Sequence, residues 1–504
     1  MNTTWGRAVL WTLMPVAGLA QAWSMATPWD GAPRWWLQLL SLGMLAWTLE
    51  RSAHWRQAAL TGWLYAVAWM AGTFWWLYIS MHTYGGLPAV LAVLGVLALA
   101  AVLALYYAAA CGLLHRYAPS ARAARALLFA ALWLLAELAR GNWFTGFGWG
   151  GSGYAHVEGP LAGYAPWLGV YGIAALAAWL AMSIPQIWAC GHGQRLAVLV
   201  VLALPSVQQM EGAAHTAAAG RLSVALLQGN IPQDEKFQPG TGVPTALRWY
   251  GEQLQANRAA LVVAPETALP LLPRQLPDGY WAALRDRYAQ GEQAALIGLP
   301  LGSLREGYTN SAVGLAPGRM PWRYDKHHLV PFGEFIPPGF KWFTTLMNIP
   351  LGDFSRGVVG QPSFDWQGQR LAPNICYEDL FGEELGARFA EPALAPTVFV
   401  NLSNIAWFGN TVAIDQHLHI SRMRALEFER PFVRATNTGS TAIVDHRGQR
   451  VAELPRHQQG VLTGEVEGRT GATPYARWVA RFGLWPLWLL GAGGLLLAVW
   501  RRRR

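Results

Sequence analysis

Charged side chains are scarce in this chain of 504 residues. They make up 13% of it, whereas ordinary soluble proteins have roughly 25%. The shortage is concentrated in residues 1–210, which contain nine Arg, no Lys and four acidic residues. This composition excludes an ordinary soluble protein over that part of the chain and predicts that it is embedded in lipid. Residues 211–504 hold the other charges and predict a more polar body.

Lysine is the rarest of the charged residues. Only three of the 38 basic residues are Lys, namely Lys236, Lys326 and Lys341. The simplest explanation for so much Arg, Ala, Gly, Pro and Trp is a codon bias across the genome. A Lys that is present despite such a bias is therefore worth testing for a specific role.

The chain also has few cysteines. Three of them exclude a disulfide framework, and no C-x-x-C or Cys/His cluster indicates a zinc site. Cys111 and Cys190 lie at the ends of apolar runs and are interpreted as packing residues. His417 and His419 lack a convincing third ligand, so no metal and no cofactor are predicted.

Long apolar runs are abundant, in contrast. A helix needs about 20 mostly apolar residues to span a membrane. The first run resembles a signal peptide, but the runs that follow it favour a retained helix. The predicted membrane-spanning runs lie near 8–26, 35–49, 58–80, 88–114, 126–139, 163–185, 196–210 and 482–500.

The loops between these runs are unequal in charge. Cytoplasmic loops of membrane proteins accumulate Lys and Arg, so the net charge of +9 is interpreted as membrane topology and not as nucleic-acid binding. With the N-terminus inside, the outer loops hold only Arg34 and Arg140, whereas Arg501–Arg504 form a cytoplasmic tail. The sequence thus predicts a multi-pass protein of a bacterial inner membrane, with both termini cytoplasmic and residues 215–478 in the periplasm.

Three domains follow from this organisation. Residues 1–212 are predicted to form a seven-helix transmembrane bundle, and 480–504 a final transmembrane helix with the Arg tail. Residues 218–472 contain short apolar runs bounded by turn residues, such as LSVALLQ, ALVVAPE, AALIGLP, TVFVNLS and TAIVDH. Such runs are typical of the buried strands of an α/β domain, so this part is predicted to be the catalytic domain.

Three segments of that domain place a reactive residue after a strand-like run. They are VVAPETALP with Glu266, YDKHHLVPFGEFIP with Lys326 and Glu334, and LAPNICYEDLFGEE with Cys376. A cysteine attacks an acyl group as its thiolate, which requires a base, and the resulting oxyanion requires a positive partner. Glu266 would take the thiol proton, Lys326 would stabilise the oxyanion and Cys376 would carry the acyl group. Each residue alone has a plainer explanation, as a helix cap, a solvated lysine or a packing cysteine.

Together, in this order and with these flanks, the three segments resemble the nitrilase, or carbon-nitrogen hydrolase, superfamily. That resemblance covers about half of the chain. The segments YDKHHLVPFGEF, NICYED, SNIAWFG and RALEFERPFVRATNTGSTAIVD, set between a helical bundle and a last apolar helix, are similar to the apolipoprotein N-acyltransferase family. The resemblance implies a transmembrane bundle of about eight helices plus a nitrilase-like αββα domain.

The family also implies roles for individual residues and for substrates. An acyl chain would pass from a phospholipid to the cysteine as a thioester, and then to the α-amine of the diacylglyceryl-cysteine that begins an apolipoprotein. The chain is expected to act as a monomer on the lipid bilayer. It departs from the family pattern at Ile405, where Asp is usual, and at Phe237, where Trp is usual. The implied catalytic residues are Glu266, Lys326 and Cys376, with Glu334 as a supporting carboxylate and Tyr377 and Glu378 as pocket residues.

Two apolar segments are candidate lipid contacts. The loop 140–162 is rich in Gly and aromatics, so either it belongs to the interfacial aromatic belt or it admits lipid, with Arg140 meeting a phosphate and Trp149 an acyl chain. The stretch 336–352 is either a buried loop or a lid that dips into the lipid surface. The residues predicted to touch lipid in this second segment and near the entrance are Trp342, Phe343, Leu346, Met347 and Phe237.

Two other functions remain open from the sequence. A membrane-tethered amidase or nitrile hydrolase would use the same triad with water as the acceptor. A transporter with a sensing domain would fit the number of helices. Transport pathways usually keep ionisable residues inside the membrane, and the predicted helices carry few besides Glu137, which disfavours the transporter.

Overall fold

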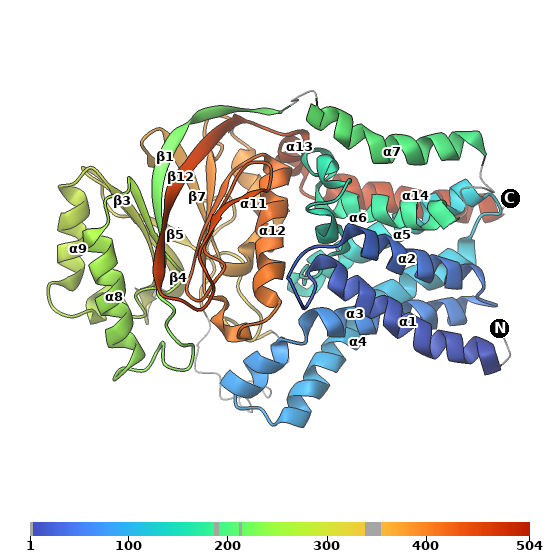
Figure 1. Cartoon of the computed structure of the whole chain (residues 1–504), viewed down its shortest axis with the longest axis horizontal. Coiled ribbons are helices and arrows are strands. Elements are labelled where there is room, and N and C mark those ends of the chain that lie inside the picture. The colour runs from blue at the N-terminus through green and yellow to red at the C-terminus, as the bar shows by residue number, and fades with distance from the viewer. Residues whose placement is uncertain (1–3, 186–190, 211–213, 338–353, 504) are drawn as a thin grey trace. The chain divides into compact units, whose positions relative to one another are not determined.

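The chain folds into two compact units in the computed structural model, which describes residues 4–185, 191–210, 214–337 and 354–503 (Figure 1). The first unit comprises Met1–Tyr78, Ala89–Ala213 and Phe482–Arg504. The second comprises Ile79–Pro88 and Ala214–Arg481. A short stretch from the N-terminal half therefore belongs to the same unit as the candidate catalytic residues.

The first unit is helical, and each apolar run predicted from the sequence overlaps one of its helices. Three short 3₁₀ turns, η2 (Trp143–Thr145), η3 (Ser152–His156) and η4 (Ala162–Tyr164), lie between α5 and α6. The α-helices are α1 (Thr4–Met25), α2 (Trp35–Glu50), α3 (Trp55–Phe74), α4 (Ala89–Tyr117), α5 (Arg122–Asn142), α6 (Ala165–Ser183), α7 (His192–Met210) and α14 (Trp485–Arg503).

Aromatic side chains form the centre of this unit. Trp69 of α3 stacks on Trp133 of α5 with ring centroids 5.8 Å apart, and Tyr107 of α4 lies 4.9 Å from each of them. Helices α1 and α3 approach closely at Gly18, where a Cβ atom would meet the carbonyl oxygen of Tyr65 at 2.2 Å. The helices are therefore fixed against one another by ring packing and close backbone contact.

The prediction of eight membrane-spanning helices is not confirmed. Among the described residues, two helical segments, Ala89–Tyr117 and Ala162–Ser183, are long and apolar enough to cross a membrane. The bent pair of α13 (Pro474–Phe482) and α14 would make a third if it formed one span. Helix α2 has only 16 residues, and α5 carries four charged side chains, Arg122, Arg125, Glu137 and Arg140. Helix α2 is therefore too short, and α5 too charged, to be a simple membrane span.

The second unit contains two six-stranded sheets. In the first sheet the strand order is β12-β1-β2-β3-β4-β5, and in the second it is β11-β10-β9-β8-β7-β6. Strands β1, β2 and β3 are parallel to one another, as are β7, β8 and β9, and antiparallel strands flank both sets. The strands are β1 (Thr216–Gln228), β2 (Leu261–Ala264), β3 (Ala294–Ser303), β4 (Gly307–Leu315), β5 (Trp322–Asp325), β6 (Phe364–Trp366), β7 (Gln369–Ile375), β8 (Val398–Ser403), β9 (Phe432–Thr436), β10 (Ala442–Val444), β11 (Arg450–Glu453) and β12 (Gly460–Gly471).

The two sheets pack face to face, with helices outside each of them. Along β1, Val224 and Leu226 belong to the core between the sheets, whereas Ala225 and Leu227 pack beneath α8 (Gly242–Ala256) and α9 (Tyr280–Ala289). This alternation follows from the two-residue period of a strand. On the second sheet, Phe428 of α12 (Ala413–Phe428) packs on Phe399 of β8, with centroids 5.5 Å apart. The predicted αββα arrangement is confirmed (Figure 1).

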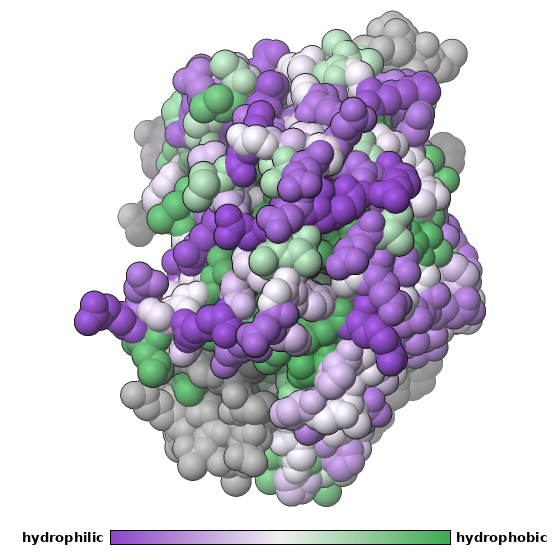
Figure 2. Space-filling model, turned by 90° about the vertical axis from the view of Figure 1, so that its left-hand side faces the viewer, coloured by the Kyte–Doolittle hydropathy of each residue, from purple (hydrophilic) through white to green (hydrophobic). Residues whose placement is uncertain are grey.

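The outer helical layer of the first sheet faces solvent. Figure 2 shows this face, where hydrophilic side chains predominate. Arg248 and Glu252 of α8 are exposed, whereas Tyr250 and Leu254 on its other side are buried. Helix α8 is therefore amphipathic in the way expected of a globular domain.

The segment Ile79–Pro88 packs within the second unit. It contains a π-helical turn, η1 (Ile79–Tyr84), and the Tyr84 ring meets Trp407 of η9 (Ile405–Phe408) edge-on, 5.9 Å between centroids. The sequence predicted one continuous helix over 58–80, but α3 ends at Phe74. Polar and aromatic residues that pack on the second unit replace its last turns.

Candidate active site

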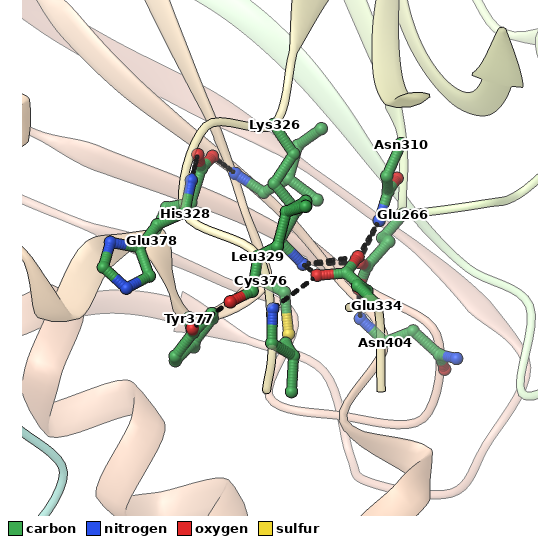
Figure 3. Close-up of polar contacts among 12 residues, drawn as sticks. Glu266, Asn310, Lys326, His328, Leu329, Glu334, Cys376, Tyr377, Glu378 and Asn404 are labelled. Carbon is green, nitrogen blue, oxygen red and sulfur yellow. Dashed lines mark hydrogen bonds and ion pairs between the residues drawn. The ribbon is translucent and has the colours of Figure 1, made fainter. Parts of the chain in front are cut away.

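The candidate residues lie at strand ends of both sheets. Glu266 comes two residues after β2, Lys326 directly follows β5 and Cys376 directly follows β7. Because the two sheets pack face to face, these ends meet at one edge of the sandwich. In Figure 3 the side chains of Glu266, Lys326 and Glu334 converge on one point, with the Cys376 sulfur beside them.

Lys326 is at the centre of this cluster. Its Nζ lies 3.2 Å from Oε1 of Glu266 and 2.9 Å from Oε2 of Glu334, and the side chain is almost fully buried. Burial disfavours the charged ammonium, but the two carboxylates outweigh it and hold the pKa of Lys326 well above its ordinary value. Lys326 is therefore a permanent cation in the site.

Glu266 is held by three further groups besides Lys326. Asn310 Nδ2 donates to its Oε1 at 2.7 Å, the backbone N–H of Asn404 donates to its Oε2 at 2.9 Å, and Lys236 Nζ donates to its main-chain carbonyl at 3.0 Å. Burial would raise the pKa of Glu266, but the Lys326 and Lys236 ammonium groups and the Asn310 bond keep it below its ordinary value. The carboxylate is thus ionised and ready to accept a proton.

Cys376 occupies a tight turn between β7 and η7 (Cys376–Leu380). Its φ of 56° lies in the left-handed region that non-glycine residues rarely adopt. Its carbonyl accepts hydrogen bonds from Asn401 Nδ2 at 2.8 Å and from the ring nitrogen Nε2 of His417 at 3.2 Å, which fix this turn. Burial and the nearby charge of Glu266 raise the pKa of Cys376 to about 12, against the effect of Lys326. The resting group is a thiol, so attack requires transfer of its proton to a base.

Glu378 fastens this turn to the segment that follows Lys326. Its carboxylate accepts the backbone N–H groups of Ile375, His327 and His328 at 2.6, 2.7 and 3.1 Å, and the Tyr324 hydroxyl at 2.8 Å. The side chain is buried, and burial raises its pKa. Glu378 therefore positions the backbone around the nucleophile, and the pocket role predicted for it stays a prediction.

Tyr377 and Glu334 lie on either side of Lys326. The Tyr377 hydroxyl donates to the carbonyl of Leu329 at 2.7 Å, and Lys326 Nζ lies 5.8 Å from the centre of its ring. Glu334 accepts Asn310 Nδ2 at 2.7 Å and the backbone N–H of Val330 at 2.8 Å. The predicted supporting carboxylate thus shares both Lys326 and Asn310 with Glu266.

Comparison with known proteins gives the family of the chain. Residues 17–183 match the model of the apolipoprotein N-acyltransferase N-terminal domain, and residues 223–475 match the carbon-nitrogen hydrolase model. An apolipoprotein N-acyltransferase of Verminephrobacter eiseniae is 62% identical over 500 residues, which cover 94% of this chain and 93% of that protein. One from Ralstonia nicotianae is 47% identical over 481 residues, covering 93% and 90%. This chain belongs to the apolipoprotein N-acyltransferase family.

The chain is therefore an acyltransferase, and its family is one of bacterial membrane enzymes. Its second unit has the carbon-nitrogen hydrolase fold. Among solved structures, a carbon-nitrogen hydrolase superfamily protein of Xanthomonas campestris is 21% identical, with a TM-score of 0.36 over 53% of this chain and 96% of that one.

The sequence analysis assigned no role to several groups that surround the apolipoprotein N-acyltransferase site. Asn310, at the β4 strand, bridges Glu266 and Glu334, and Lys236 reaches Glu266 from a loop. Behind Cys376, Asp379 pairs with His417 at 3.1 Å and with Arg434 at 3.1 Å. Asp379 stands within the NICYED segment and Lys236 is one of three lysines, so both had a signal in the sequence, whereas Asn310 had none.

Arg140 and Trp149 do not lie where lipid contact would place them. Both side chains are buried in the first unit. The Arg140 guanidinium pairs with Glu137 at 3.1 Å and donates to the carbonyls of Phe147 and Trp149 at 2.7 and 2.8 Å. This is a correction to the predicted lipid-phosphate contact, because these bonds hold the loop instead. A buried charge is paired in this way when it has no access to water.

The other predicted lipid contacts fall into two groups. Phe237 is 42% exposed, beside the buried Lys236, and remains a candidate. Ile405, where the family usually has Asp, is buried in η9. The residues proposed as a lid, Trp342, Phe343, Leu346 and Met347, lie outside the described residues.

Within the described ranges, no group of three or more His, Cys, Asp or Glu side chains could hold a metal ion.

Proposed function

We propose that this acyltransferase takes an acyl chain from a phospholipid, holds it as a thioester on Cys376, and delivers it to the α-amine of the N-terminal diacylglyceryl-cysteine of an apolipoprotein. The observation that carries the proposal is the convergence of Glu266, Lys326 and Cys376 at one edge of the sandwich. The membership of the family supports the acceptor.

In the first half-reaction Glu266 takes the Cys376 proton, and the thiolate attacks the ester carbonyl of the donor. The carbonyl π electrons move to oxygen, and the Lys326 ammonium stabilises that oxyanion. The oxyanion then collapses, the ester C–O bond breaks, and protonated Glu266 gives its proton to the departing alkoxide. The products are the Cys376 thioester and a lysophospholipid, and Glu266 is again ionised.

In the second half-reaction the neutral α-amine attacks the thioester carbonyl. Glu266 accepts the proton that the nitrogen loses, and Lys326 again faces the oxyanion. The C–S bond breaks, an amide forms, and the proton on Glu266 neutralises the released thiolate. Because water would compete with the amine for the thioester, a site that admits lipid and excludes water favours transfer.

We further infer a membrane setting for this chemistry. The Arg-poor outer loops and the Arg501–Arg504 tail support cytoplasmic termini and a catalytic unit on the periplasmic side of the inner membrane. Both proposed substrates are anchored in that membrane. A catalytic unit joined to apolar helices at both of its ends would meet them at the surface of the bilayer.

Intact-protein mass spectrometry after incubation with a defined phospholipid tests the proposal. We expect an added fatty-acyl mass on the wild type, no such mass on Cys376→Ala, and loss of the mass when a diacylglyceryl-cysteinyl peptide is supplied. Cys111→Ala, which removes a buried cysteine of the first unit, is the control and should acylate normally. A folded wild type that never forms the adduct contradicts the proposal. An adduct lost equally fast without the peptide favours a hydrolase.

Phe237 is proposed to contact the donor acyl chain near the entrance. Its exposed ring lies next to a lysine of the site, so Phe237→Asp should raise the phospholipid concentration needed for half-maximal acylation several-fold, because a charge disfavours an apolar chain. Phe237→Trp, the usual family residue, should act like the wild type. An unchanged concentration dependence in Phe237→Asp would remove Phe237 from the lipid path. The rate of Cys376 alkylation serves as the check that the site is intact.

A further inference from the structure

Two of the three lysines in the chain lie in the same buried site. Lys326 is the predicted one, and Lys236 is the other. The chain has 35 arginines in other positions, so a basic residue on its surface is nearly always Arg. A lysine at a buried position is therefore a departure from the usual choice of this chain, and its contacts need a physical reason.

Lys236 is held at a defined place by its loop. The loop follows β1, and Lys236 ends a turn in which its backbone N–H donates to the Pro232 carbonyl at 2.9 Å. Asn404 Nδ2 donates to Gln233 Oε1 at 2.8 Å, and the backbone N–H of Ile231 donates to Asn437 Oδ1 at 3.0 Å. Buried amides thus tie this loop to the segments after β8 and β9, and the ammonium is directed at Glu266.

The contact between Lys236 and Glu266 complements that of Lys326. Lys326 binds the carboxylate of Glu266, whereas Lys236 binds its main-chain carbonyl at 3.0 Å. The charge of Lys236 also acts on Cys376. Burial lowers the pKa of Lys236 to about 8, against the opposing effects of Glu266 and Cys376. The group therefore carries a positive charge at neutral pH.

The charges of the site show what this second cation does. Among the groups that contact Glu266 and Lys326 directly, the carboxylates of Glu266 and Glu334 are matched by the ammonium groups of Lys326 and Lys236, so these four charges balance. When the proton moves from Cys376 to Glu266, the negative charge passes to the sulfur. Lys236 acts on both groups, so the negative charge faces a cation before and after the transfer. Without Lys236 the same buried set would carry a net negative charge, which disfavours a thiolate.

We propose that Lys236 is a second functional lysine of this site, a positioning residue that fixes Glu266 through its main-chain carbonyl and favours the Cys376 thiolate by its charge. The inference rests on the proposed function, in which Cys376 is the nucleophile. Lys236 takes no proton from substrate and forms no bond to it.

The rate of Cys376 alkylation by iodoacetamide measures the thiolate directly, because only the thiolate reacts at a useful rate. The charged or titratable groups that act on Cys376 are Glu266, Lys326, Glu334, Lys236, Arg434 and Tyr377. Lys236→Gln removes one charge, keeps a donor for the Glu266 carbonyl and leaves the other groups in place. Peptide mapping would assign the label to Cys376 and separate it from the other cysteines.

We expect Lys236→Gln to lower the alkylation rate at pH 7 by about ten-fold, the equivalent of one unit in the thiol pKa. The difference in alkylation rate between the wild type and Lys236→Gln should narrow above about pH 8, where wild-type Lys236 loses its charge. Lys236→Arg, if it folds, should keep most of the wild-type rate. The difference between its rate and that of Lys236→Gln should not narrow above pH 8, because Arg keeps its charge there. Arg248→Gln, which removes an exposed charge on α8, should change nothing. At pH 7 the difference in alkylation rate between the wild type and Lys236→Gln should persist in high salt, since buried charges are poorly screened.

An alkylation profile of Lys236→Gln that matches the wild type would overturn the inference. A reduced rate in Lys236→Gln would also overturn it if the difference from the wild-type rate stayed constant across pH 7–10. If Lys236→Gln does not fold, Lys236→Met and Lys236→Arg repeat the comparison. A wild type that alkylates as expected but forms no acyl adduct contradicts the proposed function alone. The two failures are therefore distinguishable.

Discussion

Glu266→Gln is expected to slow both half-reactions by about 10²- to 10⁴-fold, the range observed when a general base is removed. The amide is nearly the same size, and its oxygen can still accept from Asn310, whereas its NH2 group loses the bond from the Asn404 backbone N–H. It cannot take the Cys376 proton in the first step or the amine proton in the second. Single-turnover measurements of adduct formation and of adduct consumption by the peptide acceptor would measure each step.

The control for this variant is Glu252→Gln, which changes an exposed glutamate on α8 in the same unit. It should retain wild-type rates. Glu266→Gln should still fold, because Lys326 keeps its pair with Glu334, but its midpoint of thermal unfolding should fall, because the bond from the Asn404 backbone N–H is lost. Slow adduct formation combined with normal adduct consumption would contradict the assignment, since one base is proposed to serve both steps.

The proposed catalytic residues could be suggested from the sequence because each stands in a short segment with a recognisable chemical pattern. Glu266, Lys326, Glu334 and Cys376 follow strand-like runs, and parallel strand ends meet at one edge of a sheet. Their contacts with one another depend on tertiary packing, yet the types of residue were enough to suggest them. Figure 3 shows that three of these side chains meet, with the sulfur beside them.

Other parts of the site depend on long-range contacts that leave no local pattern. Asn310 bridges Glu266 and Glu334 from a strand whose sequence is ordinary. The motif predicted Glu378 as a pocket residue, but its bonds to the backbone N–H groups of His327 and His328 could not be predicted, because they form only when the loop after Lys326 packs beside it. Lys236 was marked by rarity alone, and its contact with Glu266 comes from a loop 30 residues away in sequence.

The fold shows the same division. Short apolar runs bounded by turn residues predicted strands in both sheets, and long apolar runs predicted the helices. The membrane interpretation of those runs was less secure, because helix length and polarity differ among them: α2 is short and α5 contains Glu137 and Arg140 as a buried pair. The end of α3 was misplaced because the chain leaves the first unit a few residues after Phe74, and Ile79–Pro88 packs in the second unit, where Tyr84 meets Trp407.

Lys326→Met is expected to have the largest effect on stability. Removing one partner of a buried ion pair costs roughly 3–5 kcal/mol, and here two carboxylates lose their shared cation. For a unit of this size we expect the midpoint of thermal unfolding to fall by roughly 10 °C. Arg323→Gln is the control, since Arg323 pairs with Asp325 at 2.8 Å in an exposed position, where such a pair contributes about 0–1 kcal/mol.

The pH dependence of Lys326→Met has a predictable sign. In the wild type the pKa of Glu266 is below its ordinary value, so its ionised form contributes stability above the unfolded pKa of about 4.3, and this is lost as pH falls through the folded pKa. Without Lys326, burial dominates and the folded pKa rises above 4.3. The folded state then binds the proton more tightly, so ionisation of Glu266 should cost the variant stability as pH rises above about 4.3, whereas the same ionisation stabilises the wild type.

A second substitution separates the structural role of Lys326 from its catalytic one. In the double variant Lys326→Met, Glu334→Gln, the remaining Glu266 carboxylate still faces Lys236, and the buried charges balance again. Thermal stability should recover most of the loss and the abnormal pH dependence should diminish. Acyl transfer should stay as low as in Lys326→Met, because no cation faces the oxyanion. Recovery of activity together with stability would show that Lys326 acts only by pairing the carboxylates, whereas stability without activity assigns it to the transition state.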